Sequence, residues 1–123
     1  MPANLFHVDE QDKLYLKRQW DYLAFSYVSD KTSTDHIYQV LKEKYSEKSR
    51  FYHNLSHVKT LLSLYESLRT HIQNHHAIQF SIWFHDITYE PKRTDNEEES
   101  ARLASETLGK LGVDTQTIEL VQD

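Results

Sequence analysis

The chain contains no cysteine, only two glycines and two prolines, and no apolar stretch of useful length. The lack of cysteine excludes disulfides, thiol catalysis and thiolate metal ligands, so a metal site would need imidazole and carboxylate groups. The scarcity of glycine and proline favours long, uninterrupted helices over a β fold with many turns. Because no apolar run approaches the roughly 18 residues of a membrane span, and no signal-peptide pattern is present, we expect a cytoplasmic protein without a membrane partner.

The sequence also lacks a dominant basic stretch. Its formal net charge is −5, with both signs mixed along the chain, and we therefore expect no nucleic-acid polymer as a partner. The length of 123 residues and the hydrophobic content of 38% are typical of one small soluble domain with a real core. We accordingly treat residues 1–123 as a single domain.

Apolar residues recur at three- and four-residue spacing in five segments, which predicts an all-α fold. The expected helices cover residues 9–28, a stretch capped by Ser33 or Thr34, a stretch that begins after Asn54, residues 76–87, and a stretch from Asp95 to Gly112. The fourth segment is apolar almost all round. Such a helix is typically central and covered on several sides.

Local signals mark the two ends of the fifth helix. Asp95, followed by Glu98 three residues later, has the pattern of a capping box. Beyond Gly112, the pair Val113 and Asp114 has the pattern of a hydrophobic staple and an N-cap, which predicts a sixth helix. Only about nine residues of this helix are present, and they contain no signal for its end. We expect a bundle of about five to six helices in a chain that is truncated at its C-terminus.

The stretch "WFHDITYE" places His85 directly beside Asp86 at the end of the most apolar segment. If the third and fourth helices form an antiparallel hairpin that turns near Asn74, their lengths from the turn are roughly 22 Å to His57 and 14 Å to His85. The three side chains can therefore converge. Two hydrogen-bonded histidines and an aspartate at a helix end are the alternative interpretation.

The expected surroundings favour a metal site. His57 would lie in the first turn of its helix, where the helix dipole disfavours the imidazolium ion and leaves the neutral ring that binds metals. Asp86 would be costly as an unpaired carboxylate beside Trp83 and Phe84, and a cation removes that cost. His57, His85 and Asp86 are thus the predicted metal ligands, with a further ligand and water needed to complete the site.

The other histidines are weaker candidates for metal ligands. His53, in the loop before the third helix, is either a further ligand or a structural or substrate-facing residue. The remaining histidines are expected at helix ends or on polar faces, in solvated or capping roles: His7, His36, His71, His75 and His76.

Two stretches, "RFYHNLSH" and "WFHDITYEPKRTDNEEESA", together resemble the HD-domain superfamily, and more closely its small metal-dependent phosphohydrolases. The resemblance covers roughly residues 9–121. It implies a helical bundle in which His57, His85 and Asp86 are metal ligands. It also implies a last aspartate ligand in a later helix, for which this sequence offers no matching position.

The resemblance suggests substrate-binding roles for Arg50, Tyr52, His53 and Glu97. Arg50 would bind a phosphate oxygen, although a plain surface position explains it equally well. Tyr52 would line the pocket, although packing is the favoured explanation. Glu97 would hold a water beside the metal ligands or an arginine of the pocket.

We therefore expect a hydrolase that acts on a small phosphorylated substrate, possibly a nucleotide, by attack of a metal-activated water. Asp86 would be both a ligand and the catalytic proton acceptor. Mixed nitrogen and oxygen ligands allow manganese, cobalt, nickel, iron, zinc or magnesium. The alternative is a catalytically silent helical module that works through partner binding or as a homodimer, since the last aspartate is missing.

Overall fold

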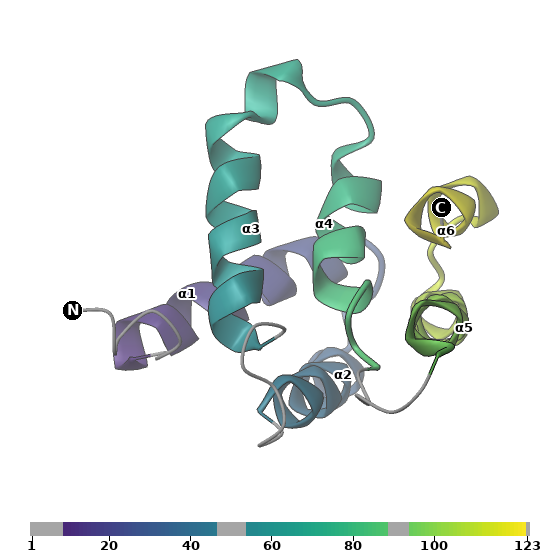
Figure 1. Cartoon of the computed structure of the whole chain (residues 1–123), viewed down its shortest axis with the longest axis horizontal. Coiled ribbons are helices and arrows are strands. Elements are labelled where there is room, and N and C mark those ends of the chain that lie inside the picture. Colours follow the sequence, from purple (N-terminus) through teal and green to yellow (C-terminus); the bar gives the residue numbers. More distant parts are fainter. Residues whose placement is uncertain (1–8, 47–53, 89–93, 123) are drawn as a thin grey trace.

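The computed structural model describes residues 9–46, 54–88 and 94–122. Within these ranges the chain is entirely helical, without strands, so the prediction of an all-α fold with five to six helices is confirmed. The elements are α1 (Glu10–Ala24), α2 (Lys31–Tyr45), α3 (Leu55–Ser67), the 3-10 turn η2 (Arg69–His71), α4 (His75–Phe84), α5 (Asn96–Leu111) and α6 (Thr115–Gln122) (Figure 1). None of the described helices has the length and apolar character needed to cross a membrane.

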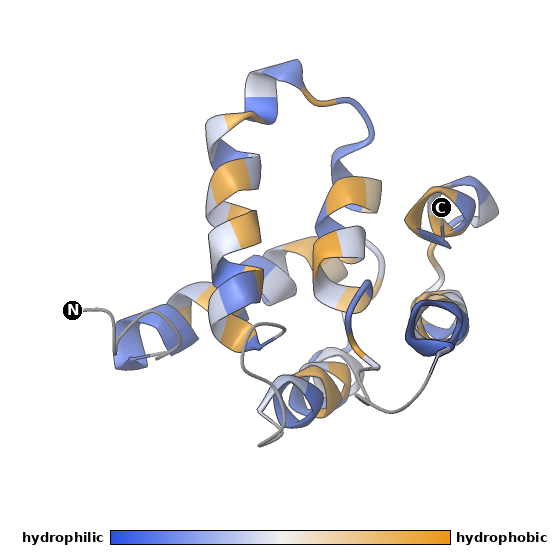
Figure 2. Ribbon diagram, in the orientation of Figure 1, coloured by the Kyte–Doolittle hydropathy of each residue, from blue (hydrophilic) through white to orange (hydrophobic). Residues whose placement is uncertain are grey.

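Helices α3 and α4 stand side by side, and η2 together with the loop after it joins them at one end (Figure 1). Helix α2 lies near the opposite end of this pair, and α5 and α6 pack on the side of α4 that faces away from α3. Hydrophobic residues are concentrated on α3 and α4 (Figure 2). Helix α4 is thus central, as its all-round apolar pattern predicted.

The core is built around Trp20 of α1 and Trp83 of α4, both completely buried. Their rings meet edge to face with centroids 5.7 Å apart, and Phe80 and Phe84 make similar contacts with Trp20 at 6.3 and 6.2 Å. The indole Nε1 of Trp20 donates to the carbonyl of Thr34 at 3.0 Å, so its one polar group is satisfied inside the core. This arrangement locks α1 and α2 against α4.

Two sequence-based expectations about helix starts are wrong. Helix α2 begins at Lys31, because Asp30 rather than Ser33 or Thr34 is its cap: the Asp30 carboxylate accepts from the backbone N–H of Thr32 at 3.1 Å. The capping box expected at α5 is not formed either. Asp95 occupies the N-cap position, but its side chain makes no capping hydrogen bond.

The signals expected at the end of α5 and at the start of α6 are confirmed. Gly112 ends α5 in the left-handed conformation with φ of 81°, and the N–H of Val113 donates back to the carbonyl of Leu108 at 3.0 Å. Asp114 then caps α6 by accepting from the N–H of Thr117 at 3.0 Å. The sixth helix predicted after Gly112 is therefore confirmed.

Candidate metal centre

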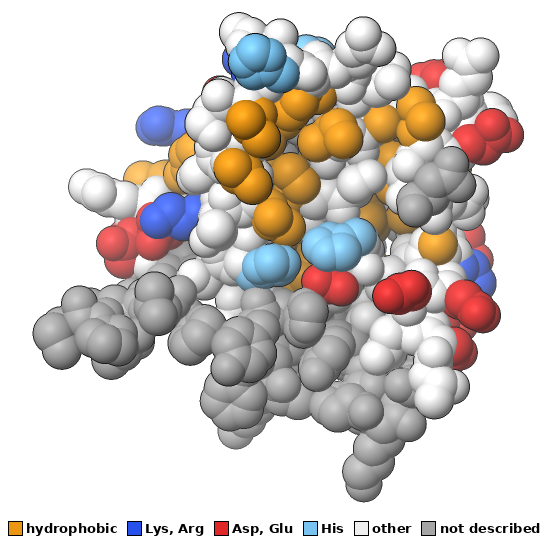
Figure 3. All heavy atoms as spheres, turned by 45° about the horizontal axis from the view of Figure 1, so that its top comes forward, with side chains coloured by type: hydrophobic (Ala, Val, Ile, Leu, Met, Phe, Trp, Pro, Cys, Tyr) orange, Lys and Arg blue, Asp and Glu red, His pale blue; other side chains and the backbone are white. Residues whose placement is uncertain are grey.

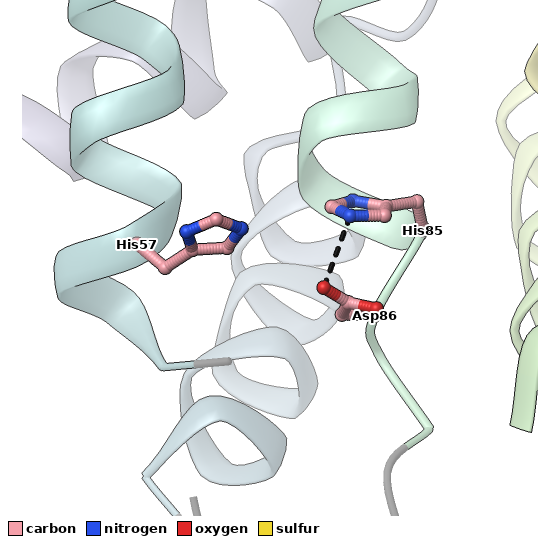
Figure 4. Close-up of side chains that lie close together, drawn as sticks. All are labelled: His57, His85 and Asp86. Atoms are coloured by element: carbon pink, nitrogen blue, oxygen red, sulfur yellow. Dashed lines mark ion pairs between the residues drawn. The ribbon is translucent and has the colours of Figure 1, made fainter. Parts of the chain in front are cut away.

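Side chains of His57, His85 and Asp86 converge between α3 and the end of α4 (Figure 4). One ligand atom from each of the three residues can be chosen so that all lie within 4.8 Å of one another. The two imidazole rings face each other across the gap between the helices, with centroids 6.1 Å apart. The convergence predicted from the lengths of the hairpin arms is confirmed.

His57 is held by the start of α3. Asn54 is the N-cap, and its side-chain oxygen accepts from the backbone N–H of His57 at 3.2 Å, which fixes the first turn of the helix. The side chain of His57 is half-buried. The ring thus lies near the positive end of the helix dipole, where the sequence placed it.

His85 and Asp86 lie in the turn that follows α4 and not inside the helix, which ends at Phe84 instead of Ile87. The difference arises because Ile87 is buried although it is outside the helix, so the apolar pattern continues past the helix end. Leaving the helix lets these neighbouring side chains turn toward each other: His85 Nε2 lies 3.0 Å from Asp86 Oδ2. Asp86 is the more enclosed, with 20% of its side chain exposed against 47% for His85.

Asp86 holds the pKa of His85 above its ordinary value through this hydrogen bond, while partial burial acts in the opposite direction. The carboxylate therefore already attracts positive charge at this point. Without an ion, a proton on the imidazole balances the negative charge of Asp86, and a divalent cation would balance it in place of the proton.

One buried and one partly buried hydrogen-bonding contact flank the His85–Asp86 turn. On the N-terminal side, the hydroxyl of Tyr45 donates to the carbonyl of Trp83 at 2.8 Å. On the C-terminal side, the Ser100 hydroxyl accepts from the N–H of Thr88 at 2.9 Å and lies 3.3 Å from its carbonyl. These hydrogen bonds hold the turn against α2 and α5, so they fix the positions of His85 and Asp86.

Sequence reasoning missed these two positioning residues. Ser100 precedes Ala104, Leu108 and Leu111 at helical spacing, and it is almost fully buried. The available signal for this role was a serine at a helix position where the spacing predicts a buried apolar residue. Tyr45 is a buried aromatic of α2, and nothing in the sequence indicated that its hydroxyl holds backbone beside the turn.

A cavity of about 310 Å³ adjoins the group and is bounded by the end of α4, by α5 and by α6. His85, Asp86 and Glu97 line it, together with Ser100 and Gln122. The structure thus brings Glu97 to the same cavity as two of the predicted ligands. The other predicted substrate-binding residues, Arg50, Tyr52 and His53, lie outside the described residues.

The donor set fits a divalent transition metal. Two imidazoles and one carboxylate are the ligands expected for manganese, iron, cobalt, nickel or zinc, whereas magnesium favours oxygen donors. The three ligand atoms lie within 4.8 Å of one another, so rotation of the side chains would be needed to bring each to about 2.1 Å from a common ion. His57, His85 and Asp86 could therefore hold an ion, with open positions left for water or substrate.

Comparison with models of known protein families, with curated proteins and with solved structures finds no match. The structure shows a six-helix, all-α arrangement within the described ranges and a His/His/Asp group that could hold a metal ion.

We predict that replacing His57 or His85 with alanine weakens binding of Mn²⁺ or Zn²⁺ by at least about 100-fold, because loss of a direct ligand should exceed the effect of losing an outer hydrogen-bond partner. Isothermal titration calorimetry on the metal-free protein measures this change. The control is His36→Ala, since His36 is exposed on α2, and it should bind like the parent. Equal affinity in all four proteins would contradict the assignment.

We also predict that Ser100→Ala lowers metal affinity about tenfold and the free energy of unfolding by about 1 kcal/mol, because the partly buried N–H of Thr88 loses its acceptor. Calorimetry and urea unfolding followed by circular dichroism measure the two effects. Ser105→Ala, on the same helix but without a role in the turn, is the matched control. Unchanged metal affinity in Ser100→Ala would show that Ser100 does not position the ligands.

Proposed function

We propose that the protein is a metal-dependent phosphohydrolase of the HD superfamily that acts on a small phosphate ester. The observation that carries the proposal is the convergence of His57, His85 and Asp86 from two sequence segments 28 residues apart. These are the same residues that the resemblance marks as metal ligands. The cavity beside them offers room for a small substrate.

His57 and His85 would hold the ion as neutral imidazoles, and Asp86 would bind it through a carboxylate oxygen. When bound, such an ion supplies Lewis acidity, which polarises a phosphoryl oxygen and lowers the pKa of water. Asp86 is the carboxylate of the group and is more enclosed than His85, and we assign it the additional role of proton acceptor for the attacking water. The hydrogen bonds of Tyr45 and Ser100 hold the backbone on either side of the turn that carries it.

The cavity also suggests how a substrate would lie. Glu97 and Gln122 supply polar groups at its wall, while Ala101, Ala104 and Val121 supply apolar surface. Glu97 repels a phosphate group and accepts hydrogen bonds from hydroxyl groups. The phosphate would therefore lie at His57, His85 and Asp86, with a hydroxyl-bearing leaving group directed toward Glu97.

The proposal predicts metal-dependent release of phosphate from a generic ester such as p-nitrophenyl phosphate. Turnover should be lost in the double variant His85→Ala plus Asp86→Ala, because both a ligand and the proton acceptor are removed. The His36→Ala variant should keep parental turnover. A parent protein that binds metal but shows no turnover above the double variant, with aryl phosphates and nucleotides alike, would contradict the proposed activity.

A second candidate function, homodimerisation of a helical binding module, is favoured by exposed apolar residues on α3 and α4. Leu64, Leu68 and Ile78 are 52%, 44% and 40% exposed. Figure 3 shows hydrophobic side chains gathered on one face between histidines. A contiguous exposed apolar patch is typical of an interaction surface.

If this face forms a homodimer, the molar mass measured by light scattering after size exclusion should rise with protein concentration. Leu64→Glu should keep the protein monomeric, because it places a charge in the apolar contact. Leu14→Glu is the matched control, since Leu14 is an equally exposed leucine, at 59%, on α1. A monomeric mass at all concentrations would rule the homodimer out.

A further inference from the structure

A second cavity, of about 410 Å³, lies at the other end of α4 from the metal centre. Its walls come from α1, from the end of α3, from η2 and from the first turns of α4. The residues that line it are Arg18, Gln19, Tyr22, Leu23, Tyr65, Glu66, Arg69, His75, His76 and Gln79. The ten residues of α4 separate it from the His85 turn by about 15 Å.

Two tyrosines fix the histidines of this cavity. The hydroxyl of Tyr65 lies 2.7 Å from Nδ1 of His75, and the hydroxyl of Tyr27 lies 2.6 Å from Nδ1 of His76. Burial raises the pKa of both tyrosines. The two hydrogen bonds hold the imidazole rings in position at the cavity. His75 and His76 lie at the start of α4, as expected, and are half-buried, and each also has a tyrosine partner.

The charged groups of the cavity are two arginines and one glutamate. Within the described part of the chain, Arg18 has no ion-pair partner. Arg69 lies 3.9 Å from the carboxylate of Glu66, at the outer limit of an ion pair, and is 61% exposed. Both guanidinium groups are thus available to a ligand. Guanidinium groups match the planar, paired oxygens of phosphate and carboxylate.

The remaining polar groups also include donors. Gln19 and Gln79 contribute side-chain amides from opposite walls. The backbone N–H groups of the first turn of α4 add the positive end of a helix dipole. Glu66 is the one carboxylate among the lining residues. Donors and positive charge therefore outnumber acceptors and negative charge.

We propose that this cavity is a second binding site, separate from the metal centre, for a small phosphate-bearing anion. Arg18 and Arg69 bind the phosphate oxygens, and Glu66 sets an upper limit on the affinity through repulsion. The proposal does not depend on the proposed hydrolase activity, because no metal ligand takes part.

The test is a titration of the metal-free protein, in EDTA at constant ionic strength, with inorganic phosphate, followed by amide chemical shifts in NMR. Saturable shifts are expected at His75 and Gln79. Arg18→Gln and Arg69→Gln should each weaken binding about fivefold, since each removes a charged donor. Glu66→Gln should tighten binding about threefold, since it removes the repelling charge.

Two variants control for general effects. Lys110→Gln removes an exposed positive charge from α5 and should leave the affinity unchanged. His57→Ala should also leave it unchanged, which separates this site from the metal centre. Non-saturable shifts, a loss in Lys110→Gln as large as in Arg18→Gln, or a loss in His57→Ala would each overturn the proposal. Chemical shifts of the core report whether each variant is folded.

Discussion

The burial of α4 is the constraint on which the rest of the structure depends. Phe80, Trp83 and Phe84 are completely or almost completely buried, and they pack against Trp20 from α1. A helix fixed on several sides cannot rotate, so the direction in which the chain leaves it is set. Because that exit lies beside the first turn of α3, His85 emerges opposite His57. The core thus determines the geometry of the candidate metal centre.

The position of the two ligands is refined by polar groups that the core itself supplies. Tyr45 and Ser100 occupy apolar positions of their helices, yet each uses its hydroxyl to hold backbone on one side of the turn. Burial of a hydroxyl is tolerated because the hydrogen bond compensates for the loss of water. Packing and ligand placement are therefore coupled at the same residues. A change in either one alters the other.

The sequence predicted the features that local patterns encode. The helices followed from apolar spacing, and the convergence of His57 with His85 followed from helix lengths and the turn near Asn74. Features decided by tertiary contact could not be foreseen. Ile87 is buried outside a helix, and the partner of Ser100 lies twelve residues away in sequence. The start of α2 was misjudged because Asp30, Ser33 and Thr34 are all good caps, and spacing alone does not rank them.

The two tryptophans have a practical consequence. They are the only ones in the chain, both are shielded from solvent, and Trp83 lies two residues before His85. Their fluorescence therefore reports on the core without contribution from surface indoles. A paramagnetic ion near His85 would quench the emission of Trp83 more than that of Trp20. The protein thus carries an intrinsic optical probe that distinguishes unfolding, which shifts the emission to longer wavelength, from occupancy of the neighbouring turn, which dims it.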